Sequence, residues 1–463
     1  MLSLLNQTLE QLDLSGNNLS GPDILKCCAL HNFSFSGLNL SGNPLAFDLS
    51  TLSDDQFLLT FKDTIVDLSH CSLYGPLTLK FRKEFCDPYF DIRINSGDTL
   101  DLSYNKLTGE IPITTTLCGL RLFSRVLLNN NLLVGRIPSE LGAIASNIHT
   151  LKLNDNRLEG DIPPSILNIT KLELLDLRNN RLQGDFATLF SWVKPPIPLI
   201  ALLLSNNRIT GSIPPSFGAF APYLQLVDIS RNSLTGVIPA NLSLQAFNLA
   251  SSANTLGWRT LYEEVQIVVK GVFTTYTYEL QVLTALHISD NHLTGAIPPE
   301  LGNLAGLYSL NLSRNMLSGS IPATLSNLRV LESMDLSFNQ LQGQIPSDFS
   351  KLDRLETFDV SYNKALEGPI PSGSVFTPNS FKGDPGLCGQ PILDKCNQSK
   401  GGSKVVEEED EHSFSRWIKK WIALPGLCLG LVVGFVETLL ALHARSCISV
   451  LCCKICALGT TNS

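Results

Sequence analysis

Residues 100–105 read Leu-Asp-Leu-Ser-Tyr-Asn, and residues 106–109 continue with Lys-Leu-Thr-Gly. The same arrangement occurs near the start of the chain, at residues 12–17 (Leu-Asp-Leu-Ser-Gly-Asn), and again near its end, at residues 334–339 (Met-Asp-Leu-Ser-Phe-Asn). The shared pattern is Leu-x-Leu-x-x-Asn-x-Leu-x-Gly. A pattern that recurs over hundreds of residues indicates an array of stacked structural units instead of one globular core.

The Asn position of this pattern, here called the ladder position, recurs thirteen times. Its spacing is 24 to 28 residues in ten of the twelve intervals, and the other two intervals are 34 and 59 residues long. These lengths fit a leucine-rich repeat, which runs to roughly 20–29 residues. The ladder residues are Asn17, Asn43, Cys71, Asn105, Asn131, Asn156, Asn180, Asn207, Asn232, Asn291, Asn315, Asn339 and Asn363.

The residue types explain the repeat. Alternating leucines point to one side of a short strand, and neighbouring turns stack them into a continuous core. The ladder Asn lies where the strand ends, and its amide can both donate to and accept from backbone groups that burial would leave unpaired. Cys71 can donate only weakly.

A Gly-x-Ile-Pro element follows many ladder positions, as at residues 109–112, 160–163, 211–214 and 319–322. Gly permits a tight bend, Ile fills the core, and Pro prevents a continuing helix or central strand. This signature resembles the plant-type extracellular leucine-rich repeat family, over roughly Leu9 to Ile392. The resemblance implies an α/β-type leucine-rich repeat solenoid, a right-handed superhelix with a parallel β-sheet on its concave side, within an ectodomain of residues 1–372.

The 59-residue interval equals one period of 24 plus about 35 inserted residues, at about 243–279. Residues 265–278 are rich in β-branched and aromatic side chains around a central Gly, which predicts a hairpin. The insertion resembles the island domain of plant receptor-like proteins, which precedes the last four repeats. We expect it to form part of a ligand surface with the neighbouring repeats. The alternative is a tolerated insertion without a contact role.

The candidate ligand-binding residues lie in this insertion and at outward strand positions beside it. They are Lys270, Tyr276, Tyr278, His287, Ser289, Asn311 and Ser313.

The repeats end in a segment at 373–398 that resembles the C-terminal cap of plant receptor-like proteins and kinases. The resemblance implies a disulfide between Cys388 and Cys396, with two free thiols as the alternative. The pairing of Cys27, Cys28, Cys71, Cys86 and Cys118 is left open.

Residues 422–444 form a predicted transmembrane helix of 23 residues, preceded by an acidic outer juxtamembrane linker at 399–421. Gly426, Gly430 and Gly434 share one helical face, where small residues let another helix approach closely. Resemblance to receptor-like proteins implies pairing with an adaptor receptor-like kinase, and lipid-facing glycine is the alternative. Glu437 within the span either has a partner or lies near the inner interface.

The tail at 445–463 is too short for an enzymatic domain. Its cysteines beside the membrane are candidate S-acylation sites, with a four-thiolate metal site as the weaker alternative. They are Cys447, Cys452, Cys453 and Cys456.

Eight Asn-x-Ser/Thr sequences precede the predicted span, which favours an extracellular N-terminal side and a plasma-membrane location. We favour this orientation although more Lys and Arg residues precede the span than follow it, which by the positive-inside rule would place the N-terminal side in the cytoplasm. The predicted N-glycosylation sites are Asn6, Asn18, Asn32, Asn39, Asn168, Asn241, Asn311 and Asn397.

Composition and motifs limit the function. The net charge of −8 and the 16% of charged residues disfavour nucleic-acid binding. No motif for catalysis, a cofactor or a metal is recognised, so we expect a non-enzyme. Met1 leads directly into a repeat, without a signal peptide or an N-terminal cap. The chain is then either truncated or directed to the membrane by its C-terminal segment.

The leading hypothesis is a single-pass receptor-like protein without a kinase domain. It would bind an extracellular peptide or elicitor and signal through adaptor and co-receptor leucine-rich repeat receptor kinases, in defence or development. One alternative is a membrane-tethered inhibitor or binding module similar to the polygalacturonase-inhibiting proteins. Another is a truncated, inactive fragment.

Overall fold

A computed structural model describes much of the chain, and all the described residues belong to the larger of two units, which ends at Cys396. The predicted juxtamembrane linker, span and tail lie outside the described residues, as do Cys27, Cys28, Cys86 and Cys118. No helix within the described part has the length and apolarity needed to cross a membrane. The described residues are 11–22, 37–51, 58–59, 65–78, 80–81, 98–112, 119–120, 122–144, 146–191, 195–220, 222–242, 265–270, 272–276, 284–373, 375–392 and 396.

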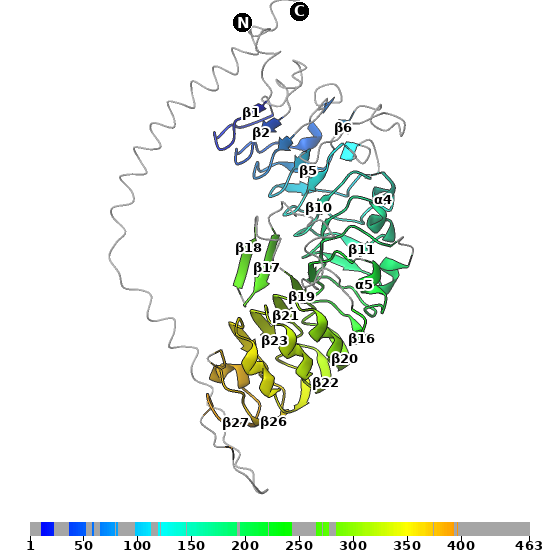
Figure 1. Ribbon diagram of the computed structural model, residues 1–463. Helices are drawn as coiled ribbons and strands as arrows, with labels where there is room; N and C mark the ends of the chain where they lie inside the picture. The colour runs from blue at the N-terminus through cyan, green and yellow to red at the C-terminus, as the bar shows by residue number, and fades with distance from the viewer. Residues whose placement is uncertain are drawn as a thin grey trace, which may run out of the picture. The chain divides into compact units, whose positions relative to one another are not determined.

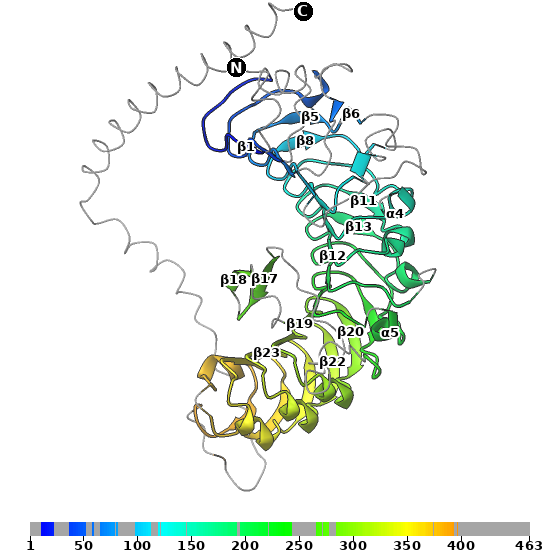
Figure 2. The same cartoon turned by 45° about the horizontal axis from the view of Figure 1, so that its top comes forward.

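A parallel sheet of thirteen short strands runs through the described repeats and lines the concave side of the solenoid (Figures 1 and 2). Each ladder position follows one strand, so the predicted repeats and their parallel sheet are confirmed. In sheet order the strands are β1 (Gln11–Asp13), β2 (Gly37–Asn39), β4 (Ile65–Asp67), β7 (Thr99–Asp101), β9 (Arg125–Leu127), β10 (Thr150–Lys152), β12 (Leu174–Asp176), β14 (Ala201–Leu203), β15 (Leu226–Asp228), β19 (Ala285–His287), β21 (Ser309–Asn311), β23 (Ser333–Asp335) and β25 (Thr357–Asp359).

The strands stack in constant register. Leu151 of β10 pairs with Val126 of β9 and Leu175 of β12, and all three side chains are buried in the core. The first and third residues of each strand therefore point out of the concave face, because side chains alternate across a strand. These outward positions form two rows along the face.

The ladder amides join neighbouring turns. Asn105 donates from Nδ2 to the carbonyls of Leu68 (2.8 Å) and Leu102 (3.0 Å), and its Oδ1 accepts from the Leu73 amide (2.9 Å). Each such side chain satisfies backbone groups that have no access to water.

Cys71 performs only half of this role. Its Sγ lies 3.1 Å from the Leu40 carbonyl, where a ladder amide would donate. It cannot accept from Leu45, whose amide bonds instead to the Asn43 carbonyl at 2.8 Å. Burial raises the pKa of the Cys71 thiol to about 11, so the thiol stays protonated and remains a donor.

The Gly-x-Ile-Pro elements build a second set of parallel strands. Gly109 and Gly319 have φ of 76°, a left-handed conformation that favours glycine, and Ile111 and Ile321 are buried. The strands of the largest such sheet are β16 (Thr235–Val237), β20 (His292–Ala296), β22 (Met316–Ser320), β24 (Gln340–Gly343), β26 (Ala365–Pro369) and β27 (Gly386–Cys388).

Smaller strand pairs continue this arrangement in the N-terminal repeats. They are β3 (Leu58–Leu59) with β6 (Lys80–Phe81), β5 (Tyr74–Pro76) with β8 (Lys106–Thr108), and β11 (Glu159–Asp161) with β13 (Arg181–Gln183).

Helical segments of the described repeats are short, and most are single 3₁₀ turns. Proline at or beside their first residue, as at Pro164 and Pro299, suits a helix start but leaves little length before the next strand. The segments are η1 (Leu49–Thr51), α4 (Leu141–Ile144), η3 (Pro164–Asn168), η4 (Ala187–Phe190), α5 (Phe217–Phe220), η7 (Pro299–Asn303), η8 (Ala323–Asn327), η9 (Ser347–Lys351) and η10 (Pro378–Phe381).

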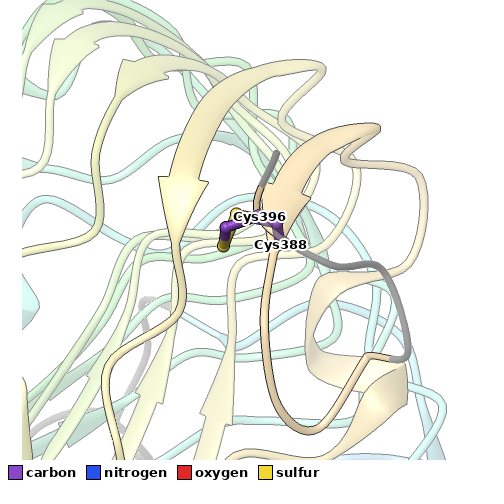
Figure 3. Close-up of a disulfide and its surroundings, with 2 residues drawn as sticks. All are labelled: Cys388 and Cys396. Carbon is purple, nitrogen blue, oxygen red and sulfur yellow. A yellow bond between two sulfur atoms is a disulfide. The ribbon is translucent and has the colours of Figure 1, made fainter. Parts of the chain in front are cut away.

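The cap closes the last repeat. Cys388 of β27 forms a disulfide with Cys396, with the two Cα atoms 5.0 Å apart (Figure 3). Asp384 takes the place of the next ladder residue, since its Oδ1 accepts from the Asn363 amide at 2.6 Å. The carboxylate thereby continues the ladder beyond its last amide.

Candidate functional site

The predicted hairpin is present in the insertion and lies over the concave side of the sheet (Figure 2). Strand β17 (Val265–Val269) pairs antiparallel with β18 (Val272–Tyr276). Val265, Ile267 and Val269 are each at most 2% exposed. They form an apolar cluster with Ile200, which precedes β14, and with outward side chains of the central strands, namely Leu174, Ala201, Leu203, Leu226 and Ala285.

Arg178 connects the N-terminal side of this cluster to the hairpin. Its guanidinium binds Asp176 through Nε (2.9 Å) and Nη2 (2.6 Å), and its Nη1 donates to the Gln266 carbonyl. A bidentate pair fixes the plane of the guanidinium, so the remaining donor has a defined direction. Arg178 therefore links the sheet to the backbone of β17.

Lys270 connects the hairpin turn to later repeats. Its Nζ lies 2.7 Å from Glu332 Oε2 and 2.6 Å from Glu356 Oε2. Tyr308 donates to the same Glu332 oxygen at 2.5 Å, and Lys270 Nζ lies 5.9 Å from the Tyr308 ring centre. These contacts join the turn to the segments leading into β21, β23 and β25.

The ionisation of this group follows from its contacts. Partial burial opposes the charge of Lys270 and Glu332, but their mutual hydrogen bond prevails, raising the pKa of Lys270 and lowering the pKa of Glu332. Burial, followed by the hydrogen bond to Glu332, raises the pKa of Tyr308 to about 12. The turn is consequently held by a charged Lys270 at neutral pH.

The docked hairpin has a hollow on either side of it along the concave face. The C-terminal hollow has a volume of about 320 Å³ and is bordered by Lys270, the strands β19 to β25 and the cap. Its lining is rich in hydroxyl, amide and carboxylate groups, including Ser309, Asn311, Asp335, Thr357, Asp359 and Asn379.

The N-terminal hollow is larger, with a volume of about 680 Å³. It extends from the repeat of Ser69 to that of Arg178, and Gln266 of the hairpin borders it. Its floor carries side chains of both charges, among them Asp101, Arg125, Lys152 and Asp176. Burial, with a smaller contribution from Asp67, raises the pKa of Asp101.

Three of the residues predicted for ligand binding, Lys270, His287 and Asn311, meet at the C-terminal hollow. His287 is 4% exposed and bonds through Nε2 to Ser309 Oγ at 2.9 Å. Burial lowers the pKa of His287, against the opposing effect of Asp228 and Asp335, so its ring is neutral. A neutral, nearly covered imidazole can contribute polarity to the hollow but little contact area.

The other predicted residues are placed differently. Tyr276 packs against the apolar cluster beneath the hairpin. Ser313 is buried and donates to Asn311 Oδ1 at 2.7 Å, and Ser289 is half-buried. Tyr278 lies outside the described residues.

The sequence did not predict the apolar surface on which the hairpin docks. It also did not predict the two tethers of the hairpin, which are the contacts of Arg178 with Gln266 and of Lys270 with Glu332 and Glu356. A signal was available, because Leu174, Ala201, Leu203, Leu226 and Ala285 are apolar at strand positions that face outward. The tethering acids also recur, since Glu332 and Glu356 occupy the same position in consecutive repeats. Neither signal indicates which segment of the chain covers these outward apolar residues.

The predicted glycosylation sites fall in two environments. Asn18, Asn168 and Asn241 are exposed, whereas Asn39 and Asn311 are half-buried third residues of concave strands. Asn6, Asn32 and Asn397 lie outside the described residues, as do the glycines and cysteines predicted for helix pairing and S-acylation.

Comparison with known proteins places these features in a family. The family described as "Leucine rich repeat" matches residues 281–341 and 305–364, and the related "Leucine Rich Repeat" matches 98–117, 147–169, 198–220 and 223–245. Receptor-like protein 35 of Arabidopsis thaliana is 32% identical over 307 residues, which cover 64% of this chain. The chain is similar to the plant leucine-rich repeat receptor-like proteins.

The chain spans only part of the length of its curated relatives. It covers 30% of receptor-like protein 35, and 26% of receptor-like protein 32 of Arabidopsis thaliana, to which it is 33% identical over 238 residues. The matched region is thus a fraction of each relative.

Solved plant receptors share its solenoid. The Arabidopsis receptor kinase HAESA, in complex with the peptide hormone IDA and the co-receptor SERK1, superposes with a TM-score of 0.56 at 28% identity, covering 85% of this chain and 64% of that one. The plant peptide hormone receptor RGFR1, in complex with RGF2, gives 0.56 at 27% identity, covering 81% and 54%. The solenoid of this chain therefore resembles those of plant receptor ectodomains.

Proposed function

We propose that this receptor-like protein recognises an extracellular peptide in the C-terminal hollow and signals through partner receptor kinases. The observation that carries the proposal is the hairpin docked across the concave sheet. Lys270 at its turn, the outward residues of four repeats and the cap together border one hollow.

The chemistry of the hollow suits a peptide. Hydroxyls and amides at Ser309, Asn311 and Thr357 can bond to peptide groups, and Asp335 and Asp359 offer carboxylates to amides or basic side chains. Pockets with a few convergent polar groups are typical ligand sites. The likeness to solenoids solved with peptide hormones supports the same class of ligand.

The signalling part of the proposal rests on the sequence. The predicted span with Gly426, Gly430 and Gly434 offers a helix-pairing face for an adaptor kinase. A co-receptor in the complex of HAESA with IDA supports partners of this kind. The repeat domain would face the outside of the plasma membrane.

A peptide selection tests the ligand site. The full chain, purified in detergent, would be used to select binders from a displayed random peptide library. Asn311→Trp should abolish binding of the selected peptides because the indole fills the hollow. Lys152→Trp is the matched control, since Lys152 occupies the equivalent row position in the N-terminal hollow. Selected peptides that bind both variants equally would contradict the site.

Co-precipitation tests the signalling partner. The tagged chain in plant cells should recover receptor kinases, and the change of all three glycines to Leu should reduce that recovery severalfold. Mobility shifts on glycan removal in both samples would verify equal passage through the secretory pathway. Glycosylated protein without any kinase in either sample would favour the tethered binding module instead.

A further inference from the structure

The N-terminal hollow is a second concave site, on the opposite side of the hairpin from the proposed peptide site. Its volume of about 680 Å³ is within the range of small-molecule sites. It is bordered by Gln266 of the hairpin and by strands from β4 to β12. None of the residues predicted from the sequence to bind ligand lines it.

The lining of this hollow is almost wholly polar. Leu127 is its one aliphatic residue, and the remaining side chains are Ser, Asn, Asp, Gln, Lys, Arg, His and Tyr. An apolar peptide side chain would find no matching pocket here. A ligand that presents hydroxyl groups along its length would meet donors and acceptors at every repeat.

Asn154 supplies an acceptor that the protein itself does not use. Its side chain is 8% exposed, and its Nδ2 donates to Asp155 Oδ2 at 2.6 Å, which fixes the orientation of the amide. Its Oδ1 is buried and has no hydrogen-bond partner. A buried acceptor without a partner destabilises the free protein, and a donor from a ligand would relieve that cost.

The charges of the hollow balance. Its lining contains three basic residues, Arg125, Lys152 and Arg178, and three acidic residues, Asp101, Asp155 and Asp176. Arg178 and Asp176 form an ion pair. Such a surface gives no net attraction for a strongly charged ligand. It favours a neutral ligand with dense hydrogen-bonding groups.

An aromatic edge completes the site. His70 and Tyr104 stack with ring centres 4.2 Å apart, and Tyr104 is 43% exposed. An aromatic ring has an apolar surface on which the C–H groups of a sugar ring can pack. Polar planar side chains beside an exposed ring are the combination that carbohydrate binding requires.

We infer that the N-terminal hollow binds a neutral oligosaccharide, which packs against Tyr104 and donates a hydroxyl to Asn154 Oδ1. The site is separate from the peptide site and does not depend on it. An extended peptide in the same hollow is the competing outcome.

Calorimetric titration of the full chain in detergent tests the inference, with cellohexaose, xylohexaose and mannohexaose as neutral probes. At least one probe should bind saturably. Asn154→Ala should weaken its binding by about tenfold through loss of the acceptor. Tyr104→Asn should also weaken binding, and Asn is suited to the φ of 54° at this position.

Asn311→Ala is the matched control, because it removes an amide from the other hollow and should leave saccharide binding within about twofold. Thermal melting of each variant separates loss of binding from loss of folding, and Asn154 takes no part in the ladder. The inference is overturned if no neutral probe binds, if Asn154→Ala and Tyr104→Asn both bind like the unaltered chain, or if the hollow selects only hexagalacturonate or peptides.

Discussion

The side-chain amide of a single ladder residue forms hydrogen bonds with several backbone groups. Asn131 is 5% exposed; its Nδ2 donates to the carbonyls of Leu102 and Leu128, and its Oδ1 accepts from the Leu107 amide. Asn131→Ala should destabilise the protein by about 2–4 kcal/mol, because each buried group left unpaired costs about 1–3 kcal/mol and the effects overlap.

Cys71→Ala is the comparison, since this ladder residue offers one weak donor and no acceptor. Its cost should be about 1 kcal/mol. Urea denaturation followed by circular dichroism would measure both variants. Equal losses at the two positions would contradict the role assigned to the amide acceptor.

Asp384 gives the cap a distinct dependence on pH. Burial raises its folded-state pKa to about 7 from 3.8, and the Asn363 amide only partly offsets this. Because the folded state holds its proton more tightly, the stability that Asp384 contributes is present in acid and is lost as pH rises from about 4 to 7. Asp384→Asn should remove this loss and stabilise the cap at pH 8 by on the order of 2 kcal/mol.

Melting temperatures from pH 4 to 8 would test this, with Asp353→Asn as a control at an exposed carboxylate. His287 acts in the opposite direction: its lowered pKa makes the folded state resist protonation, so stability falls as pH drops below about 6.5. The difference between Asp384→Asn and the unaltered chain isolates the cap. A difference that does not change with pH would contradict the assignment.

Asn311 cannot serve two predicted roles at once. It lines the C-terminal hollow and accepts from Ser313, so a glycan attached there would occupy the proposed peptide site. We expect mass spectrometry of the full chain from plant cells to find glycans at exposed Asn168 and Asn241 and an unmodified Asn311. Full occupancy at Asn311 would exclude a peptide from this hollow.

At the scale of elements, the hairpin depends on its apolar underside. Ile267 is 1% exposed against the sheet, whereas Val272 on the partner strand is 62% exposed. Ile267→Asp should detach the hairpin, because an unpaired carboxylate cannot remain in an apolar contact. Val272→Asp introduces the same charge into water and should leave the hairpin docked.

Hydrogen exchange of β17 amides measures the difference. We expect protection in Val272→Asp to match the unaltered chain and protection in Ile267→Asp to fall at least about tenfold. Equal protection in both variants would mean that Arg178 and Lys270 alone hold the hairpin.

The repeats could be predicted from the sequence because each one repeats a local requirement. Leu alternation, the ladder amide and the Gly-x-Ile-Pro bend concern neighbours in the chain or in the next turn. The hairpin could also be predicted from residues close together in the sequence, since β-branched residues flank a central Gly. Its docking could not, because Lys270 meets acids 62 and 86 residues further on, and no periodicity links them.

For the whole molecule, the solenoid makes stability a local property. Each turn contacts its neighbours, so a defect at one end need not reach the other. Changing Cys388 and Cys396 to Ser should cost about 2 kcal/mol in the cap, as expected for a short closed loop. Hydrogen exchange should increase in β26 and β27 and remain unchanged in β10. An increase in β10 as well would indicate one cooperative unit.

The two tethers of the hairpin restrict where the number of repeats can change during evolution. Repeats in such arrays are gained and lost by recombination, and an added or deleted turn shifts everything beyond it by one strand spacing, about 4.8 Å. Outside the hairpin such a change leaves each turn with equivalent neighbours. Between Arg178 and Glu356 it would carry one tether out of reach of its partner. Lineages of this protein should therefore vary in repeat number toward the N-terminus and keep a fixed count beneath the hairpin.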